Sequence, residues 1–403
     1  ASPAALRASE NRHHHALCDG ETAECEAGTQ KIHWLGWFEM EYTLRSLGSF
    51  SEMKYGKMPN KKMSSDKGKY PIFSGYRVVG YCDECNIGEQ QLVVVARGVG
   101  GTGDVKLSPG ACFLTNLSIA VLVDESVALK KYLYYYFLKN NLRYLDSGSA
   151  QSQITIGDLK NVEVPLPSIE TQKKVVSILD VIDEKINNNV AINDNLADLL
   201  QTIYQDRFGN DILAVNQGVL SDICSYSRDK VAVSELNVST YFSTENMLSE
   251  KAGSTEATSL PTTSQTTACH KGDTLISNIR PYFKKIVYCE GNCGCSTDVL
   301  CFTPSQPRYS TYLFSTLYAD KFFAFMVAGS KGTKMPRGDK QQIMTYPVVL
   351  PPEEELAGFN TIASPLLKQI YSNRAENKRL SILRDTLLPK LMSGEIDVSA
   401  VQL

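Results

Sequence analysis

Two long segments of the chain share one periodic pattern of apolar positions. The first segment starts after Pro167 and advances in alternating steps of four and three residues. Its positions are Val175, Leu179, Ile182, Ile186, Asn189, Asn193, Leu196, Leu200 and Ile203, and a second set with the same spacing lies at Phe359, Ala363, Leu366, Ile370, Asn373, Asn377, Leu380, Arg384 and Leu387. Such spacing is typical of a coiled-coil seam. The pattern therefore predicts two long helices with matching seams.

Each predicted seam contains two consecutive asparagines, Asn189 with Asn193 and Asn373 with Asn377. A polar side chain on a seam is unfavourable unless it finds a hydrogen-bonding partner. In an antiparallel helix pair the two couples would lie opposite each other and would fix the register. The alternative is that the two helices are unrelated and that their asparagines face solvent.

A region of strand-like runs precedes each predicted long helix. From Tyr42 the runs YPIF, RVVGY, LVVVA and LSIAVLV alternate with glycine and proline, and a helix is expected around Leu129 to Leu145. The polar turn GSAQSQIT and the strand-like VEVPLP then lead into the first long helix, which should end near Phe208 because Gly209 and Asn210 follow.

The second half of the chain repeats this order from Leu220. It contains a Ser/Thr-rich loop from Ser254 to Thr267, the strand-like runs DTLISNIRP, IVYCE and STDVLCF, and a helix expected around Tyr309 to Met326. The segments GSKGTKMPRGD and VVLPPEEEL then precede the second long helix. The order indicates a tandem duplication in which the helices are more alike than the regions before them.

The repeated order predicts an α+β fold, a tandem repeat of two mixed α/β domains joined by two long antiparallel coiled-coil helices. We expect a leader, or an extension added for expression, at residues 1–39, and the first mixed domain at 40–166. The first helix would occupy 167–209, the second mixed domain 210–351, and the second helix with a C-terminal tail 352–403.

Composition limits the class of protein. The 403 residues are 43% hydrophobic, enough for the cores of two or three domains. No stretch approaches the roughly 20 apolar residues of a membrane helix. Eleven cysteines without an upstream secretory segment indicate reduced thiols in a cytoplasmic protein. The formal net charge is only −3, so any nucleic-acid binding would need locally concentrated positive charge or charge supplied by partners.

One glycine-rich segment imitates a cofactor-binding motif. Gly98, Gly100 and Gly103 have GxGxxG spacing after an apolar run. A dinucleotide or S-adenosylmethionine site needs a helix to begin there, whereas Pro109 and Gly110 fall inside the span that such a helix would occupy. A glycine hairpin between strands is therefore the preferred interpretation. Without a Walker loop, a nucleophile elbow or paired zinc-protease histidines, the chain is predicted to be non-catalytic, with no cofactor of its own.

Two groups of cysteines have spacing that resembles part of a zinc site. They are Cys82 with Cys85, and Cys289 with Cys293 and Cys295. Neither group supplies four ligands locally, and histidines are few and distant. We expect small buried hydrophobic residues here, with structural zinc as the alternative.

Basic and polar residues at predicted strand ends and turns are candidates for contacts with DNA. Arg97 ends the run LVVVAR, and Arg280 ends LISNIR at what looks like the equivalent place. The segment from Lys54 to Lys69 contains six lysines. The full candidate set is Lys57, Lys61, Lys62, Arg97, Ser149, Gln151, Arg280, Lys284, Lys331 and Lys334. The alternatives are structural ion pairs for the arginines and a solvated face for the lysines.

The starts of the long helices, PLPSIETQKKVVSILDVIDEKI and VLPPEEELAGFNTIASPLLKQI, together with the Gly-Ser turns before them and the terminal LRDTLLPKLMSGEI, carry a resemblance to a known family. From Met40 to Leu403 the chain resembles the DNA specificity subunit of type I restriction-modification systems. Leu356 stands where the first copy has Gln172, which leaves the role of that glutamine open.

The resemblance implies two target recognition domains, each of which reads one half of a split asymmetric site in double-stranded DNA. It further implies spacer helices that act as a ruler, two modification subunits that bring S-adenosylmethionine, and restriction subunits that bring ATP-dependent chemistry. Half-sites about one helical turn apart, roughly 34 Å, would suit two readers on a stiff spacer. The rival hypotheses are an S-adenosylmethionine-dependent DNA methyltransferase and a coiled-coil scaffold that binds proteins only.

Overall fold

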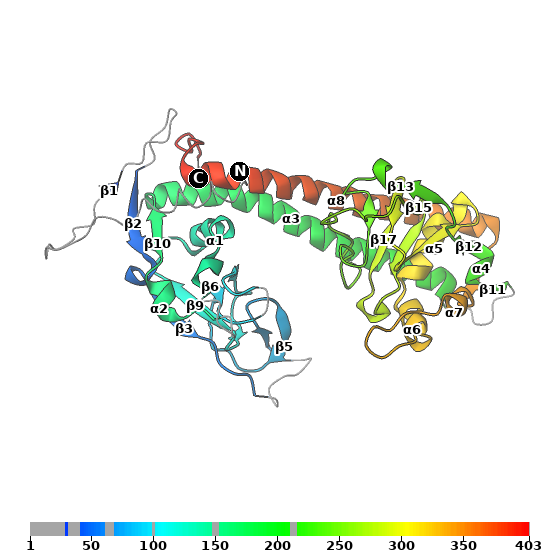
Figure 1. Ribbon diagram of the computed structural model, residues 1–403, viewed down its shortest axis with the longest axis horizontal. Coiled ribbons are helices and arrows are strands. Elements are labelled where there is room, and N and C mark those ends of the chain that lie inside the picture. The colour runs from blue at the N-terminus through cyan, green and yellow to red at the C-terminus, as the bar shows by residue number, and fades with distance from the viewer. Residues whose placement is uncertain are drawn as a thin grey trace. The chain divides into compact units, whose positions relative to one another are not determined.

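The computed structural model describes residues 29–30, 41–60, 68–98, 101–146, 153–209 and 216–402 (Figure 1). The chain divides into two units with separate cores. The first unit consists of residues 1–182 and 383–403, and the second of residues 183–382. Each unit therefore contains its own sheets and a section of both long helices, so that segments distant in sequence share one core.

The first unit is built on an antiparallel sheet with the strand order β3-β9-β6-β7. Its strands are β3 (Ser51–Tyr55), β9 (Ser118–Val123), β6 (Leu92–Val95) and β7 (Val105–Leu107). All of β6 is buried because both faces are covered. Leu92 and Val94 pack in one cluster with residues of α1 (Lys130–Lys139), whereas Val93 packs in another with Phe73 and Leu114. This double cover explains why the run LVVV lacks polar alternation.

Three further strands cover the other face of that sheet. They have the order β5-β4-β8, with β5 (Val78–Cys82), β4 (Tyr70–Phe73) and β8 (Phe113–Leu114). A third small sheet pairs β2 (Tyr42–Ser46) with β10 (Glu163–Leu166) and with β1 (Thr29–Gln30). The strand β1 falls within the segment expected to be a leader; the rest of residues 1–39 lies outside the described residues.

The second unit repeats the main strand order as β12-β19-β16-β17. These strands are β12 (Cys224–Tyr226), β19 (Val299–Pro304), β16 (Thr274–Ser277) and β17 (Ile286–Tyr288). One face packs on α5 (Ser310–Tyr318) and α6 (Asp320–Ala328). The other packs on the sheet β13-β15-β18-β14, with β13 (Lys230–Ala232), β15 (Gln265–Cys269), β18 (Cys293–Cys295) and β14 (Tyr241–Phe242).

Two predicted helices are shorter than the sequence suggested. The helix expected around Leu129 to Leu145 ends at Lys139, and Asn141 caps a following 3-10 helix by accepting from the N–H of Arg143. The helix expected around Tyr309 to Met326 is α5 and α6, separated where Ala319 is extended. Every residue of α5 except the last is buried, so no polar face marked its end in the sequence.

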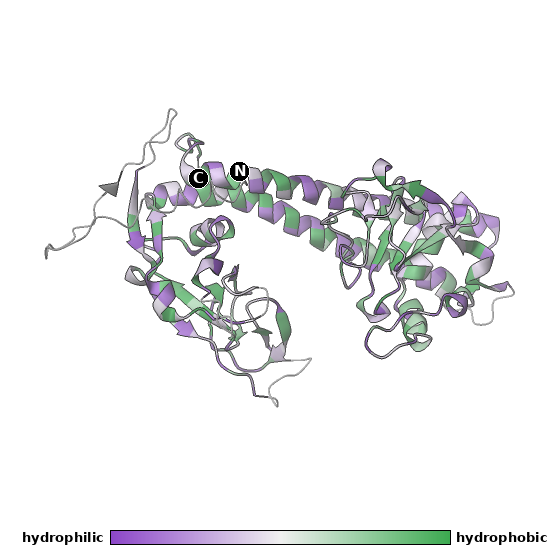
Figure 2. Cartoon of the chain, in the orientation of Figure 1, coloured by the Kyte–Doolittle hydropathy of each residue, from purple (hydrophilic) through white to green (hydrophobic). Residues whose placement is uncertain are grey.

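The two long helices are α3 (Ile169–Tyr204), followed by a π-helical turn at Gln205–Gly209, and α8 (Glu353–Ser393). Each is preceded by a short helix and a strand: α2 (Ile156–Lys160) and β10 before α3, and α7 (Lys340–Met344) and β20 (Pro347–Val349) before α8. The strand β20 pairs with β11 (Gln217–Val219), which leads into α4 (Leu220–Ile223). None of the predicted seam positions is exposed, and hydrophobic and hydrophilic residues alternate along both helices (Figure 2).

No helix in the described part of the chain combines the length and the hydrophobicity required to cross a membrane.

The side chain of Gln172 joins the start of α3 to the loop before α1. It is fully buried; its oxygen accepts from the N–H of Leu129 at 2.9 Å, and its Nε2 donates to the carbonyls of Pro167 and Val127 at 3.0 and 3.2 Å. In the second unit, Leu356 is also buried, but within an apolar cluster. The role left open by the sequence is therefore a polar connection in one unit and an apolar contact in the other.

Replacing Gln172 with leucine should lower the free energy of unfolding of the first unit by about 2 to 4 kcal/mol, because one backbone N–H and two carbonyls lose their buried partner. The matched change Leu356→Gln should also destabilise, since it buries an amide among apolar side chains. Urea unfolding of both variants measures these effects. Parental stability of Gln172→Leu would show that the three hydrogen bonds contribute nothing net.

Candidate functional site

The structure brings together the four asparagines of the seams, all within the second unit. Asn189 Nδ2 donates to Asn377 Oδ1 at 2.8 Å, and Asn373 Nδ2 donates to Asn193 Oδ1 at 2.9 Å. The order of the partners means that α3 and α8 run antiparallel here. Asn189, Asn193 and Asn373 are at most 7% exposed. The alternative in which these asparagines face solvent is therefore excluded.

Neighbouring polar groups extend the asparagine contacts. Asn189 Nδ2 also donates to Glu376 Oε2 at 2.7 Å, and this hydrogen bond, with Lys185 3.4 Å away, lowers the pKa of the Glu376 carboxyl. Asn377 Nδ2 donates to the carbonyl of Ile186 at 3.2 Å. These contacts give the amides partners that apolar seam positions cannot supply.

The glycine-rich segment forms the hairpin predicted from the sequence, because β6 pairs antiparallel with β7. A strand, rather than a helix, thus follows the motif. A Cβ atom on Gly98 or Gly101 would approach Tyr76 to 2.4 or 2.3 Å, and one on Gly103 would approach the backbone of Arg143 to 2.5 Å. The glycines at these positions therefore permit close packing, and the described geometry supplies no helix N-terminus for a cofactor.

The cysteines of the two candidate zinc groups are mostly buried. Cys82, Cys289, Cys293 and Cys295 are buried and Cys85 is exposed, and all nine cysteines among the described residues are free thiols. One apolar cluster between the sheets of the second unit contains Cys269, Cys289, Cys293, Cys295 and Cys301. No group of three or more metal-ligating side chains within the described ranges could hold a metal ion. The expectation of small buried hydrophobic residues is confirmed for all but Cys85.

Arg97 and Arg280 do not occupy equivalent positions, contrary to the prediction. The backbone N–H of Ala96 donates to the carbonyl of Leu117, the residue before β9, at 2.8 Å. The N–H of Asn278 donates to the carbonyl of Asp298, the residue before β19, also at 2.8 Å. These matching bonds make Ile279 the counterpart of Arg97, and Arg280 lies one residue further along. The reason is that β16 begins one residue before its apolar run, at a threonine.

The two arginines also differ in their surroundings. Arg97 is exposed and forms a β-bridge with Gln153. Arg280 is half-buried, and its Nε is enclosed without a hydrogen-bond partner. In the parts of the chain that the structure describes, neither arginine pairs with a carboxylate. The structural ion pair considered as an alternative is therefore not formed by described residues.

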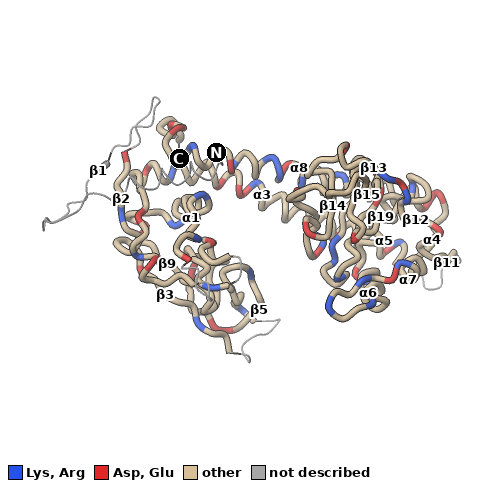
Figure 3. The backbone as a smooth tube through the Cα atoms, in the orientation of Figure 1, with Lys and Arg blue, Asp and Glu red and all other residues tan. Residues whose placement is uncertain are grey.

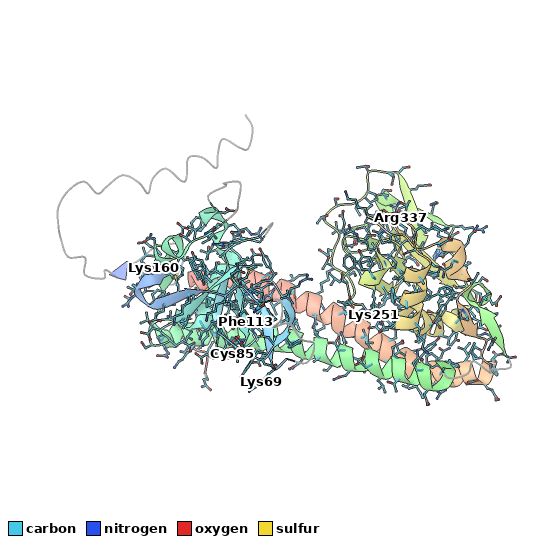
Figure 4. The ribbon with its side chains drawn as sticks, turned by 90° about the horizontal axis from the view of Figure 1, so that it is seen from below. Lys69, Cys85, Phe113, Lys160, Lys251 and Arg337 are labelled. Carbon is cyan, nitrogen blue, oxygen red and sulfur yellow. The ribbon has the colours of Figure 1, made fainter. Side chains whose placement is uncertain are left out.

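A hollow with a volume of about 690 Å³ lies beside Arg280 in the second unit. Its lining includes Asn246, Lys285 and Asp298. The Lys285 Nζ donates to a backbone carbonyl at 2.6 Å, and burial lowers its pKa. Asp298 pairs at 3.0 Å with Arg337, which is labelled in Figure 4. The sequence interpretation missed Lys285 and Arg337; the second could have been noticed because it lies in the turn that aligns with GSAQSQIT.

The remaining candidates for DNA contacts have different environments. Lys57 and Lys334 are exposed, whereas Lys284 is paired with Asp320 at 3.0 Å and Lys331 with Asp339. Lys61, Lys62, Ser149 and Gln151 lie outside the described residues. Basic and acidic residues are interspersed along the backbone of each unit, as Figure 3 shows. Along the described residues, the two signs of charge therefore alternate instead of forming one long basic run.

Comparison with known proteins gives consistent results. The model of the type I restriction modification DNA specificity domain matches residues 39–197. A Mycoplasma pneumoniae protein named as a type I specificity subunit, S.MpnORF638P, is 30% identical over 166 residues, which cover 39% of this chain and 44% of the relative. The type I restriction enzyme MjaIX specificity subunit of Methanocaldococcus jannaschii is 23% identical over 348 residues, 70% of this chain and 73% of the relative.

A solved structure shares the fold. The S subunit of a type I restriction-modification system from M. genitalium superposes with a TM-score of 0.56 at 20% identity, covering 87% of this chain and 96% of that chain. The match to S.MpnORF638P, in contrast, spans less than half of that relative.

Replacing Asn373 alone with leucine should lower the free energy of unfolding by about 1 to 3 kcal/mol, because the Asn193 oxygen is left buried without its donor. Adding Asn193→Leu should recover most of that loss, and leucine at all four positions should stabilise the helix pair while loosening its register. Denaturant unfolding of the single and double variants gives the coupling energy. Purely additive losses would contradict a direct pair.

Proposed function

Because the chain belongs to the family of type I restriction-modification specificity subunits, we propose that it recognises DNA for such a system. Each unit would supply one target recognition domain, and each domain would read one half of a bipartite asymmetric site. The observation that carries the proposal is that one strand order recurs in both units while the loops at the strand ends differ. Two readers of different half-sites need such a shared framework with different loops.

The target recognition domains would be residues 40–166 and 210–351, and the two long helices would set the spacing of the half-sites. The asparagine contacts between α3 and α8 support this role, because a shift of one heptad would place an amide against an apolar residue. We infer that Asn189, Asn193, Asn373 and Asn377 fix the register of the spacer.

Catalysis would reside in partner subunits. Two modification subunits would bring S-adenosylmethionine and restriction subunits would cut DNA, while this chain supplies recognition in the cytoplasm. The methyltransferase alternative receives no support from the glycine segment, since a strand follows it. The scaffold alternative predicts no DNA binding, whereas recognition predicts salt-dependent binding when the modification subunits are present.

Methylome sequencing of a host that carries the complete system should reveal one split asymmetric site. Exchanging residues 42–172 for those of a relative should then change only one half of that site; this boundary keeps Gln172 with its hydrogen-bond partners. Exchanging residues 217–356 is the matched control and should change only the other half. If either exchange alters both halves, the model of two independent readers is wrong.

Arg97→Ala should weaken DNA binding of the assembled complex by about 1 to 3 kcal/mol and relax one half-site if the arginine reads a base. A phosphate contact would weaken all sequences alike and reduce the salt slope by about one. Arg97→Lys is the control, because it keeps the charge but loses the paired donors of the guanidinium. Binding titrations at two salt concentrations distinguish the outcomes, and the same series on Arg280 tests the second unit. Unchanged affinity in both alanine variants would remove these residues from the DNA interface.

A further inference from the structure

The loop after β16 presents an aromatic pair on a turn with an unusual backbone. The turn is a 3-10 helix, Pro281–Phe283, bounded by Arg280 and Lys284. Both bounding residues adopt the left-handed conformation, each with φ of 50°. Residues other than glycine rarely do so, and they keep this conformation only where surrounding contacts impose it.

Backbone hydrogen bonds fix the turn from two sides. The N–H of Arg280 donates to the carbonyl of Pro336 at 2.8 Å. From the other side, Glu250 and Lys251 donate to the carbonyls of the last residue of the 3-10 helix and of its C-cap, at 2.8 and 3.0 Å. Glu250 and Lys251 are themselves left-handed, with φ of 53° and 62°. The backbone of the turn is therefore held in one conformation before any partner arrives.

Tyr282 and Phe283 are the aromatic side chains of this turn. They are 47% and 36% exposed, and their ring centroids lie 4.8 Å apart at an angle of 56°. Phe283 forms part of the wall of the hollow. The ring of Phe283 thus packs against the ring of Tyr282, and Tyr282 is the more exposed of the two. In the first unit the corresponding loop is the glycine hairpin, which has no aromatic residue in its described part.

Two basic residues, Arg280 and Lys284, flank the turn that carries the Tyr282 ring. Arg280 precedes it, is half-buried and has no ion-pair partner among the described residues. Lys284 follows but is paired with Asp320. Two of the three carboxylates that line the hollow form ion pairs, Glu256 with Lys378 and Asp298 with Arg337, at 2.7 and 3.0 Å; Glu245 is the third.

We propose that Tyr282 stacks on a base of the DNA half-site read by the second unit, with Arg280 providing positive charge beside it. The inference rests on the proposed function. A ring that stacks on a base within a duplex partly opens a base step, so the DNA would bend there. A ring carried on a backbone turn of fixed conformation suits this role because the backbone loses little further freedom on binding.

The test uses the assembled complex with its modification subunits and duplexes that contain its methylated site, with 2-aminopurine at successive positions of the second half-site. Wild-type binding should raise the fluorescence at one step. Tyr282→Ala should abolish that increase and raise Kd by about 5- to 150-fold. Tyr282→Phe keeps the ring and should retain the increase. Tyr144→Ala, which removes an exposed tyrosine from a 3-10 helix of the first unit, should leave the signal in the second half-site unchanged.

Four results would overturn the inference. Unchanged affinity and fluorescence in Tyr282→Ala would show that the ring does not meet a base. Loss of modification subunits from Tyr282→Ala during size-exclusion chromatography would assign the ring to a protein contact instead. Loss of the fluorescence increase in Tyr282→Phe would mean that the hydroxyl, rather than stacking, acts on the base. If the wild-type complex binds no DNA, the proposed function fails together with this inference, whereas the first three results leave the proposed function intact.

Discussion

A buried amide needs a hydrogen-bonding partner, and in the second unit the seam asparagines of α3 and α8 supply one another with such partners. The aliphatic positions of a seam tolerate exchange with one another, because dispersion and burial depend little on which apolar side chain lies opposite. The pairs Asn189–Asn377 and Asn193–Asn373 do not tolerate it. The alignment in which these hydrogen bonds form also packs Tyr204 on Phe359, with ring centroids 6.4 Å apart.

Each unit places its central strand between a helical layer and a second sheet. Successive residues of β6 belong to different clusters, with Val93 on one side and Leu92 and Val94 on the other. A strand covered in this way has no solvent face on which to vary its residues. The loops at the strand ends also differ, with a glycine hairpin in one unit where the other has a strained aromatic turn.

Long-range periodicity made the two helices and the asparagine contacts predictable from the sequence, and glycine and proline placement predicted the hairpin after β6. Other features depend on backbone geometry that residue types do not specify. The one-residue difference between Arg97 and Arg280 arises where β16 starts, and the break at Ala319 interrupts a segment without a polar face. The hydrogen bonds of Gln172 join residues far apart in sequence, so no local pattern could indicate them.

The five thiols packed between the sheets of the second unit affect how this protein can be handled. Cys269, Cys289, Cys293, Cys295 and Cys301 share one apolar cluster, and the sulfur atoms of Cys289 and Cys293 lie 3.5 Å apart. While the unit is folded, burial shields them from oxidants. Once the unit unfolds in air, Cys289, Cys293, Cys295 and Cys301 are close together in sequence, and this closeness favours incorrect disulfides that block refolding. Without a reductant, the time for which this unit stays folded is then set by its rate of unfolding rather than by its equilibrium free energy of unfolding.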